Sequence, residues 1–202
     1  GVQPHCRPQR QLGQISVALR STIYKCELQI ADLRRHYYAD HALTLALHPS
    51  ETDERMMVRV LAFALFAAER LSFTRGLSAT DEPDLWQKDY TDAIKRWIDV
   101  GQPDETRIKK ACSRADQVVV MPFGHAAHVW WQPLSTKVSR FDNLQVLQIA
   151  DDDAKALGRL VSRSMQLQCT IDEAGGVLVT AADAALQIHP TVLKAAAAEA
   201  NA

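Results

Sequence analysis

Hydrophobic and polar residues alternate along two segments near the start of the chain. Residues 24–30 and 43–47 each place apolar side chains at every second position, which is typical of half-buried strands. The polar connection at 31–35 is short enough for a hairpin. The pattern therefore predicts a β-hairpin at the beginning of the fold.

After these strands the apolar period lengthens to three or four residues. Ser50 and Asp53 have the spacing of a helix capping box, and apolar residues follow at helical spacing over 57–68. Because this helix is apolar almost all round, we expect it in the core. Further helices are predicted over 104–115 and from Asp151 onward, where three consecutive aspartates suit a helix N-terminus.

Short apolar runs in the rest of the chain predict further strands. Residues 117–123 form a continuous apolar run, as expected of a strand covered on both faces. Strands combined with helices in this order indicate an α+β fold, a compact single domain with a mixed β-sheet flanked by helices. The other predicted strands are 71–75, 85–90, 94–100, 128–131, 144–149, 165–171 and 177–180.

Composition agrees with one folded domain. The chain has 202 residues, of which 47% are hydrophobic and 23% charged, as in ordinary globular proteins. We expect a flexible N-terminal extension over 1–17, which shows no periodicity, and a single domain over 18–202. The net charge of −1 excludes an overall positive field, so nucleic acid would bind only through a local patch. A protein partner is the alternative, and the oligomeric state is open.

Targeting signals and cysteine spacing indicate a cytoplasmic protein. The longest apolar run, 61–68, is far shorter than the roughly 20 residues of a membrane-spanning helix. We expect no secretory signal, because the first twenty residues contain no apolar stretch long enough for one. Four cysteines without C-x-x-C spacing predict separate reduced thiols rather than disulfides or a zinc ribbon. They are Cys6, Cys26, Cys112 and Cys169.

Three carboxylates occupy positions where carboxylates are unusual. Glu54 shares a helix face with apolar residues, Asp84 follows a proline at the start of a predicted strand, and Asp99 lies inside an apolar strand. A buried carboxylate needs a partner, and carboxylate oxygens are the ligands that Mg²⁺ prefers. The acids therefore predict a site for Mg²⁺ or Mn²⁺. In the structural alternative they cap turns, accept backbone N–H groups or pair with Arg55 or Arg59.

The order of these acids resembles the PD-(D/E)XK nuclease superfamily, and longer blocks of the sequence resemble the YaeQ family. That resemblance covers roughly residues 19–179 and implies a compact fold around a variant PD-(D/E)XK, restriction-endonuclease-like core. The blocks are TIYKCELQI at 22–30, HPSETDERMM at 48–57, DEPDLW at 81–86, WIDVGQPDE at 97–105, RADQVVV at 114–120, RFDNL at 140–144 and MQLQC at 165–169.

The resemblance also implies roles for particular residues. Glu54 matches the helix acid, Asp84 the acid after proline, and Asp99 the first acid of the (D/E)XK strand, so that all three would hold the metal in a shared pocket. Gly101 stands where the motif has its lysine.

A neighbouring side chain is expected to fill the place of that lysine. The candidates are Gln102, Arg107 and Lys110, with Arg107 the nearest, because a long side chain can bring its charge from an adjacent helix. The implied function is a metal-dependent nuclease or phosphodiesterase in which the metal activates water. The alternative is an inactive nuclease-like binding or regulatory protein, linked to transcription or nucleic-acid metabolism.

Overall fold

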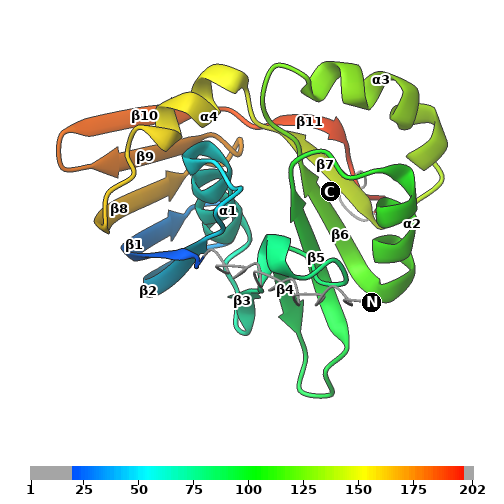
Figure 1. Cartoon of the computed structure of the whole chain (residues 1–202), viewed down its shortest axis with the longest axis horizontal. Coiled ribbons are helices and arrows are strands. Elements are labelled where there is room, and N and C mark those ends of the chain that lie inside the picture. The colour runs from blue at the N-terminus through cyan, green and yellow to red at the C-terminus, as the bar shows by residue number, and fades with distance from the viewer. Residues whose placement is uncertain (1–19, 198–202) are drawn as a thin grey trace, which may run out of the picture.

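The strands form two mixed sheets in the computed structural model, which describes residues 20–197 (Figure 1). In the five-stranded sheet the order is β10 (Ala184–Ile188), β9 (Val177–Ala181), β8 (Ser164–Ile171), β1 (Thr22–Asp32) and β2 (Tyr37–Leu47). In the six-stranded sheet it is β11 (Thr191–Lys194), β7 (Leu144–Gln148), β6 (Ala115–Met121), β5 (Ile94–Val100), β4 (Leu85–Lys88) and β3 (Leu71–Phe73).

Four α-helices accompany these sheets within the described residues. Helix α1 packs between the two sheets, α4 lies beside α1, and α2 and α3 cover the other face of the six-stranded sheet (Figure 1). No helix within residues 20–197 is long and apolar enough to cross a membrane. The helices are α1 (Asp53–Phe66), α2 (Glu105–Arg114), α3 (Ala127–Val138) and α4 (Asp151–Gly158), with a short 3₁₀ helix, η1, at Gly76–Ser78.

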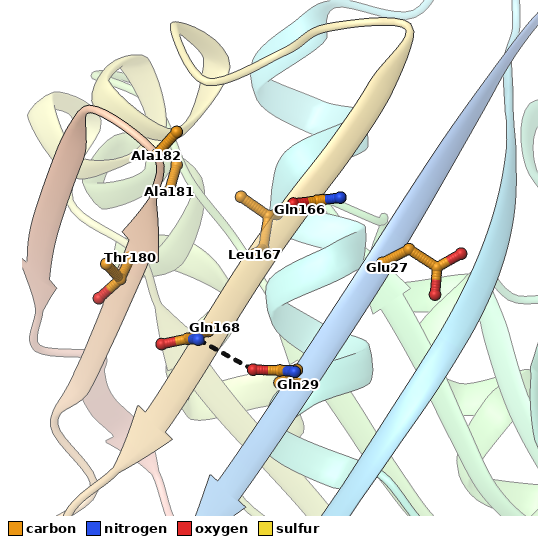
Figure 2. A pocket seen from close by; sticks show the side chains of 8 residues that line it. All are labelled: Glu27, Gln29, Gln166, Leu167, Gln168, Thr180, Ala181 and Ala182. Carbon is orange, nitrogen blue, oxygen red and sulfur yellow. Dashed lines mark hydrogen bonds between the residues drawn. The ribbon is translucent and has the colours of Figure 1, made fainter.

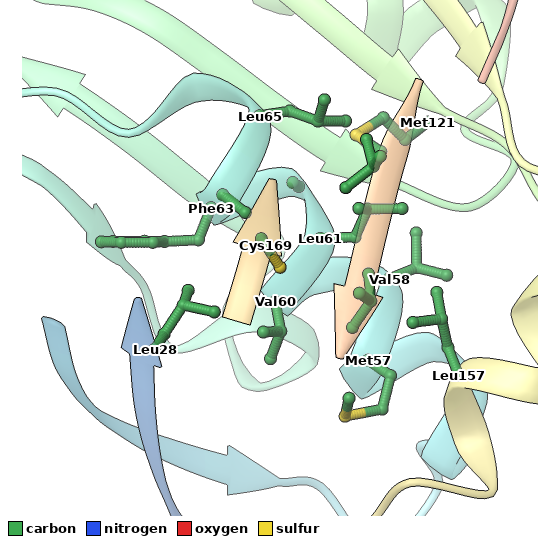
Figure 3. Close-up of a cluster of buried hydrophobic side chains, with 14 of the residues drawn as sticks. Leu28, Met57, Val58, Val60, Leu61, Phe63, Leu65, Met121, Leu157 and Cys169 are labelled. Atoms are coloured by element: carbon green, nitrogen blue, oxygen red, sulfur yellow. The ribbon is translucent and has the colours of Figure 1, made fainter. Parts of the chain in front are cut away.

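The α+β class and the flanking helices are confirmed, but the predicted single sheet is wrong. Helix α1 is buried around its whole circumference from Met56 to Leu65. One sheet can cover only one side of a helix, so the strands supply a sheet on either side. Leu28 and Cys169 of the five-stranded sheet and Met121 of the six-stranded sheet pack around α1 (Figure 3). Burying each such large apolar side chain contributes about 1.5–3 kcal/mol.

The predicted hairpin is confirmed and is longer than expected. Strands β1 and β2 pair antiparallel over eleven residues each. The turn is fixed to the end of α1 by the fully buried Asp32, whose carboxylate accepts hydrogen bonds from Arg34 and Arg35. The same two arginines donate to the carbonyls of Leu65 and Ala67, so the hairpin and the helix hold each other in place.

The start of α1 differs from the prediction by two residues. The N-cap is Thr52, whose hydroxyl accepts the backbone N–H of Arg55. Ser50, the predicted cap, instead places its hydroxyl 2.7 Å from Nδ1 of His48. A one-turn capping motif cannot be placed from spacing alone when serine and threonine both lie within it.

One predicted strand is a helix. Residues 128–131 lie in α3, whose buried side chains Ala127, Leu134 and Val138 recur at helical spacing. Trp130 and Trp131 favour strands by intrinsic propensity, and the packing of α3 on the sheet overrides that preference. The predicted α4 is confirmed but ends at Gly158, and β10 and β11 were not predicted.

The cysteines within the described residues are free thiols, as predicted. Burial raises the pKa of Cys26 and of Cys112 to about 11 and that of Cys169 to about 12. Thiols with such pKa values are poor nucleophiles at neutral pH, which agrees with a packing role. Cys6 and the expected extension at 1–17 lie outside the described residues.

Candidate functional site

A cleft of about 380 Å³ opens where β5 ends, and two of the three candidate acids line it. Strand β4 runs antiparallel to β5, and the backbone N–H of Asp84 donates to the carbonyl of Ile98. This pairing brings Asp84 beside Asp99, although fourteen residues separate them in the sequence. The remaining wall is the loop that contains η1.

Asp84 is almost completely buried at 3% exposure, and both of its carboxylate oxygens accept hydrogen bonds. Oδ2 accepts the backbone N–H of Val100 at 2.7 Å, and Oδ1 accepts Nη2 of Arg55 at 2.7 Å. Burial raises the pKa of Asp84 above its ordinary value, because the loss of hydration outweighs the attraction of Arg55. The carboxylate is therefore held in place by two donors.

Asp99 is equally buried and meets a second arginine. Arg107 on α2 donates from Nε to Oδ2 at 2.9 Å and from Nη2 to Oδ1 at 2.7 Å, and the indole N–H of Trp97 donates to Oδ2 at 3.0 Å. Two parallel bonds of this kind form the strong, directional fork between guanidinium and carboxylate. The bond to Asp99, more than the nearby negative charges, raises the pKa of Arg107.

Arg55 belongs to a longer buried network that runs along α1. Its Nη1 donates to Oε1 of Glu51 at 2.8 Å, and Arg59 donates to both oxygens of Glu51, at 2.8 and 2.9 Å. The Glu51 side chain is only 2% exposed. Sequence reasoning missed Glu51 as a site residue. The available signal was its spacing of four and eight residues from Arg55 and Arg59, the spacing at which opposite charges pair along a helix.

Arginine, not aspartate, forms the exposed part of each pair. The Arg107 side chain is 31% exposed and that of Asp99 is 4%, while the values for Arg55 and Asp84 are 16% and 4%. A molecule that enters the cleft therefore meets guanidinium edges, with the carboxylates beneath them.

Glu54 does not join the other two acids. An ideal Cβ placed on Gly158 of α4 would lie 3.0 Å from Cγ of Glu54, so this glutamate lies against α4, and it is not among the residues that line the cleft. Neighbouring residues on a helix point about 100° apart, which directs Arg55 into the cleft and Glu54 away from it. In place of three converging acids the structure brings together two.

The three candidates for the missing lysine have different positions. Arg107 reaches Asp99, as described above. Gln102 lines the cleft, but its amide donates to the carbonyl of Phe123 at 2.8 Å. Lys110 is not among the lining residues and pairs with the exposed Asp81 at 2.5 Å. An ideal Cβ on Gly101 meets nothing within 4 Å, so the space beside that glycine is open.

The arrangement does not fit Mg²⁺ or Mn²⁺ as it stands. No group of three His, Cys, Asp or Glu side chains gathers within residues 20–197 in a way that could hold a metal ion. Both oxygens of Asp84 and of Asp99 are already engaged by N–H donors. A hard cation binds several oxygen ligands, and at this site it would be repelled by the guanidinium groups that already lie against the two carboxylates.

Arg107 also fixes the wall of the cleft. Its Nη1 and Nη2 donate to the carbonyls of Thr80 and Glu82 at 2.9 and 2.8 Å. The same guanidinium that neutralises Asp99 therefore holds the loop after η1 against α2.

A second hollow, of about 410 Å³, lies on the outer face of the five-stranded sheet (Figure 2). Its lining includes Gln29 and Gln168, whose amides bond to each other at 2.9 Å, and one charged residue, Glu27. Functional pockets typically contain charged groups that point toward one another. In this protein such groups line the cleft at the end of β5. The cleft is therefore the stronger candidate.

Comparison with known proteins identifies the family. Residues 17–190 match the model of the family described as YaeQ protein. The chain is 46% identical over 176 residues to the uncharacterised protein YaeQ of Salmonella typhi, which covers 87% of this chain and 97% of that protein. The YaeQ protein of Escherichia coli (strain K12) is also 46% identical, over 158 residues, with 78% of this chain and 87% of that protein covered.

Solved structures agree with the sequence comparison. The crystal structure of the YaeQ protein from Xanthomonas axonopodis pv. citri superposes with a TM-score of 0.84 at 48% identity, covering 87% of this chain and 99% of that one. The YaeQ protein from Pseudomonas syringae gives 0.83 at 35% identity, with 87% and 97% covered. The chain belongs to the YaeQ family.

Proposed function

We propose that the cleft binds the phosphate groups of a nucleic-acid strand through the exposed edges of Arg107 and Arg55, and that the protein does not hydrolyse the bound strand. The observation that carries this proposal is the pairing of each cleft aspartate with its own arginine. The protein is then a nuclease-like binding protein, in which guanidinium groups stand where a nuclease holds its cation.

The absence of hydrolysis follows from the positions of the residues that the nuclease motif would use. Metal-assisted hydrolysis depends on carboxylates that hold a cation and on a cation that activates water. Here the two convergent carboxylates are occupied, Glu54 lies against α4, and Gly101 offers no side chain where the motif has lysine.

The binding of phosphate is supported by what the cleft presents to solvent. Four of the five N–H groups of Arg107 already donate to Asp99, Thr80 and Glu82. The remaining N–H on Nη1 and the positive charge of this guanidinium, the most exposed member of the two pairs, support the binding of a phosphate oxygen. Because Asp84 and Asp99 lie directly beneath and balance the charge, we expect weak binding with a shallow salt dependence, since the slope grows with the number of phosphates neutralised.

Fluorescence anisotropy with a labelled single-stranded oligonucleotide in EDTA tests the proposal. We expect wild-type protein to bind and Arg107→Lys to bind about tenfold more weakly, because lysine keeps the charge but loses the planar guanidinium that Asp99 holds at the edge of the cleft. Arg140→Gln is the matched control, since Arg140 is exposed and packs over the Phe141 ring away from the cleft. Its affinity should equal that of the wild type.

The same oligonucleotide, incubated with Mg²⁺ or Mn²⁺, tests the alternative. Cleavage by the wild type that Asp99→Asn abolishes would overturn the proposal and establish a metal-dependent phosphodiesterase. Equal affinity of wild type and Arg107→Lys would contradict the assignment of the cleft as the binding site.

A further inference from the structure

The five-stranded sheet ends on β2, the longest edge strand in the described part of the chain (Figure 1). Strand β2 has eleven residues, whereas the other edge strands β10, β11 and β3 have five, four and three. It pairs with β1 without a bulge and contains neither proline nor glycine. Natural sheets protect such edges with bulges, prolines, charges or short strands, so an unprotected edge indicates a partner.

The direction of the backbone groups of β2 follows from one hydrogen bond. Nη2 of Arg59 donates to the carbonyl of Ala46 at 3.0 Å, so this carbonyl points away from β1. In an antiparallel pair, the groups that point away recur at every second residue. The N–H and C=O groups of the other even-numbered residues of β2 therefore point outward as well.

The hydrogen bonds on the other side of β1 independently show that the even-numbered residues of β2 face outward. The N–H of Lys25 donates to the carbonyl of Arg163 beside β8, so the odd-numbered residues of β1 bond to β8 and its even-numbered residues bond to β2. Their partners in β2 are odd-numbered. None of the outward-facing residues Tyr38, Asp40, Ala42 and Thr44 has a backbone hydrogen bond to a turn, loop or helix of the described chain.

The side chains at this edge leave room for another strand. Tyr38 is 62% exposed, and Asp40, Ala42 and Thr44 are also exposed. Asp40 is the one charged residue among them. The other end of the strand is flanked by Arg59 and the loop at 74–78, so the free edge runs over residues 38–44.

We propose that two copies of this chain pair antiparallel through residues 38–44 of β2, with the two-fold axis beside His41. This register places Asp40 opposite Ala42 of the second copy and Tyr38 opposite Thr44 of the second copy. No like charges lie directly opposite each other, and every outward N–H meets a carbonyl. Each copy supplies hydrogen-bond partners for the free edge of the other, as an isologous interface requires. The five-stranded sheets of the two copies then form one continuous sheet. The proposal does not depend on the function of the cleft.

Sedimentation velocity of the full chain tests the pairing over about 10–100 µM protein, because dimers dissociate on dilution by mass action. We expect the wild type to sediment as a dimer and Ala42→Asp as a monomer, because the new carboxylate faces Asp40 of the second copy. Adding Asp40→Lys to Ala42→Asp should restore the dimer. Ala185→Asp is the matched control, since Ala185 is an exposed alanine on the other edge strand, β10.

A second variant separates lost pairing from lost folding. Ala42→Pro removes one outward N–H and no bond to β1, and edge strands accept proline at such positions, so it should fold with a wild-type circular dichroism spectrum and sediment as a monomer. A monomeric wild type would overturn the proposal and leave the edge to a strand of another protein. A dimeric Ala42→Asp, or a double variant that stays monomeric, would also overturn the proposed pairing.

Discussion

At the residue scale, each buried carboxylate is stabilised by the arginine side chain that faces it. Asp84 and Asp99 in the cleft, and Asp32 in the first hairpin, all lie at 3% exposure or less, and each meets at least one arginine. Removing one partner of a buried pair is costly because it leaves the other charge unsatisfied. These aspartates therefore support the fold whatever their role in binding.

Asp32 should give stability that is lost in acid. Burial raises its pKa, but the hydrogen bonds from Arg34 and Arg35 outweigh burial and hold the pKa below the ordinary value of 3.8. A lowered pKa in the folded state stabilises the protein above the unfolded pKa, and this stability disappears as the pH falls through the folded value. Asp32→Asn should therefore lower the free energy of unfolding by about 2 kcal/mol at pH 7.

Urea unfolding at pH 7 and at pH 3 measures this contribution. The difference between wild type and Asp32→Asn should shrink at pH 3, because this pH lies below the ordinary pKa of 3.8. The unfolded wild type then takes up a proton at Asp32, and the charged pairing stabilises the folded state less. Asp183→Asn, at an exposed position in the turn between β9 and β10, should match the wild type at both pH values. If the loss in free energy of unfolding caused by Asp32→Asn is the same at pH 7 and at pH 3, the lowered pKa of Asp32 contributes nothing to stability.

At the scale of elements, the sequence predicts best where burial is periodic. The hairpin follows from alternation, and α1 follows from an apolar helical run whose lack of a polar face correctly predicts its central position. The same absence of a polar face also implies two covering layers, which the prediction of one sheet did not take into account. Helix α3 was missed because adjacent tryptophans favour a strand locally, while contacts with distant residues decide the outcome.

The cap of α1 offers a test at this scale. Thr52→Ala should lower the free energy of unfolding by about 1 kcal/mol, because the backbone N–H of Arg55 loses its acceptor. Ser50→Ala is the paired control and should cost much less, since Ser50 lies outside the helix and its hydroxyl bonds to His48. Thermal or urea unfolding of both variants compares them directly, and a larger loss for Ser50→Ala than for Thr52→Ala would place the cap at Ser50.

At the scale of the whole molecule, the cleft exists because α1 meets the consecutive elements β4, β5 and α2 at the end of β5. The N-terminal turn of α1 supplies Arg55, the pair β4 and β5 supplies the aspartates, and α2 supplies Arg107. The acids could be predicted from their unusual apolar surroundings. Arg107 could be predicted as well, because a long side chain on the following helix can reach back to Asp99. The pairing of Arg55 with Asp84 could not, because charge pairing between elements depends on a relative placement that local periodicity does not encode.

The central claim is that arginines occupy the place of a cation at Asp84 and Asp99, and calorimetry of wild type and Asp99→Asn with and without millimolar Mg²⁺ or Mn²⁺ tests it most directly. Without metal, Asp99→Asn should melt several degrees lower, because the half-buried Arg107 loses its charged partner at a cost of about 2–3 kcal/mol. Metal should leave both melting temperatures unchanged. A wild-type melting temperature that rises with metal, together with an Asp99→Asn variant that is at least as stable without metal and does not respond to it, would contradict the account.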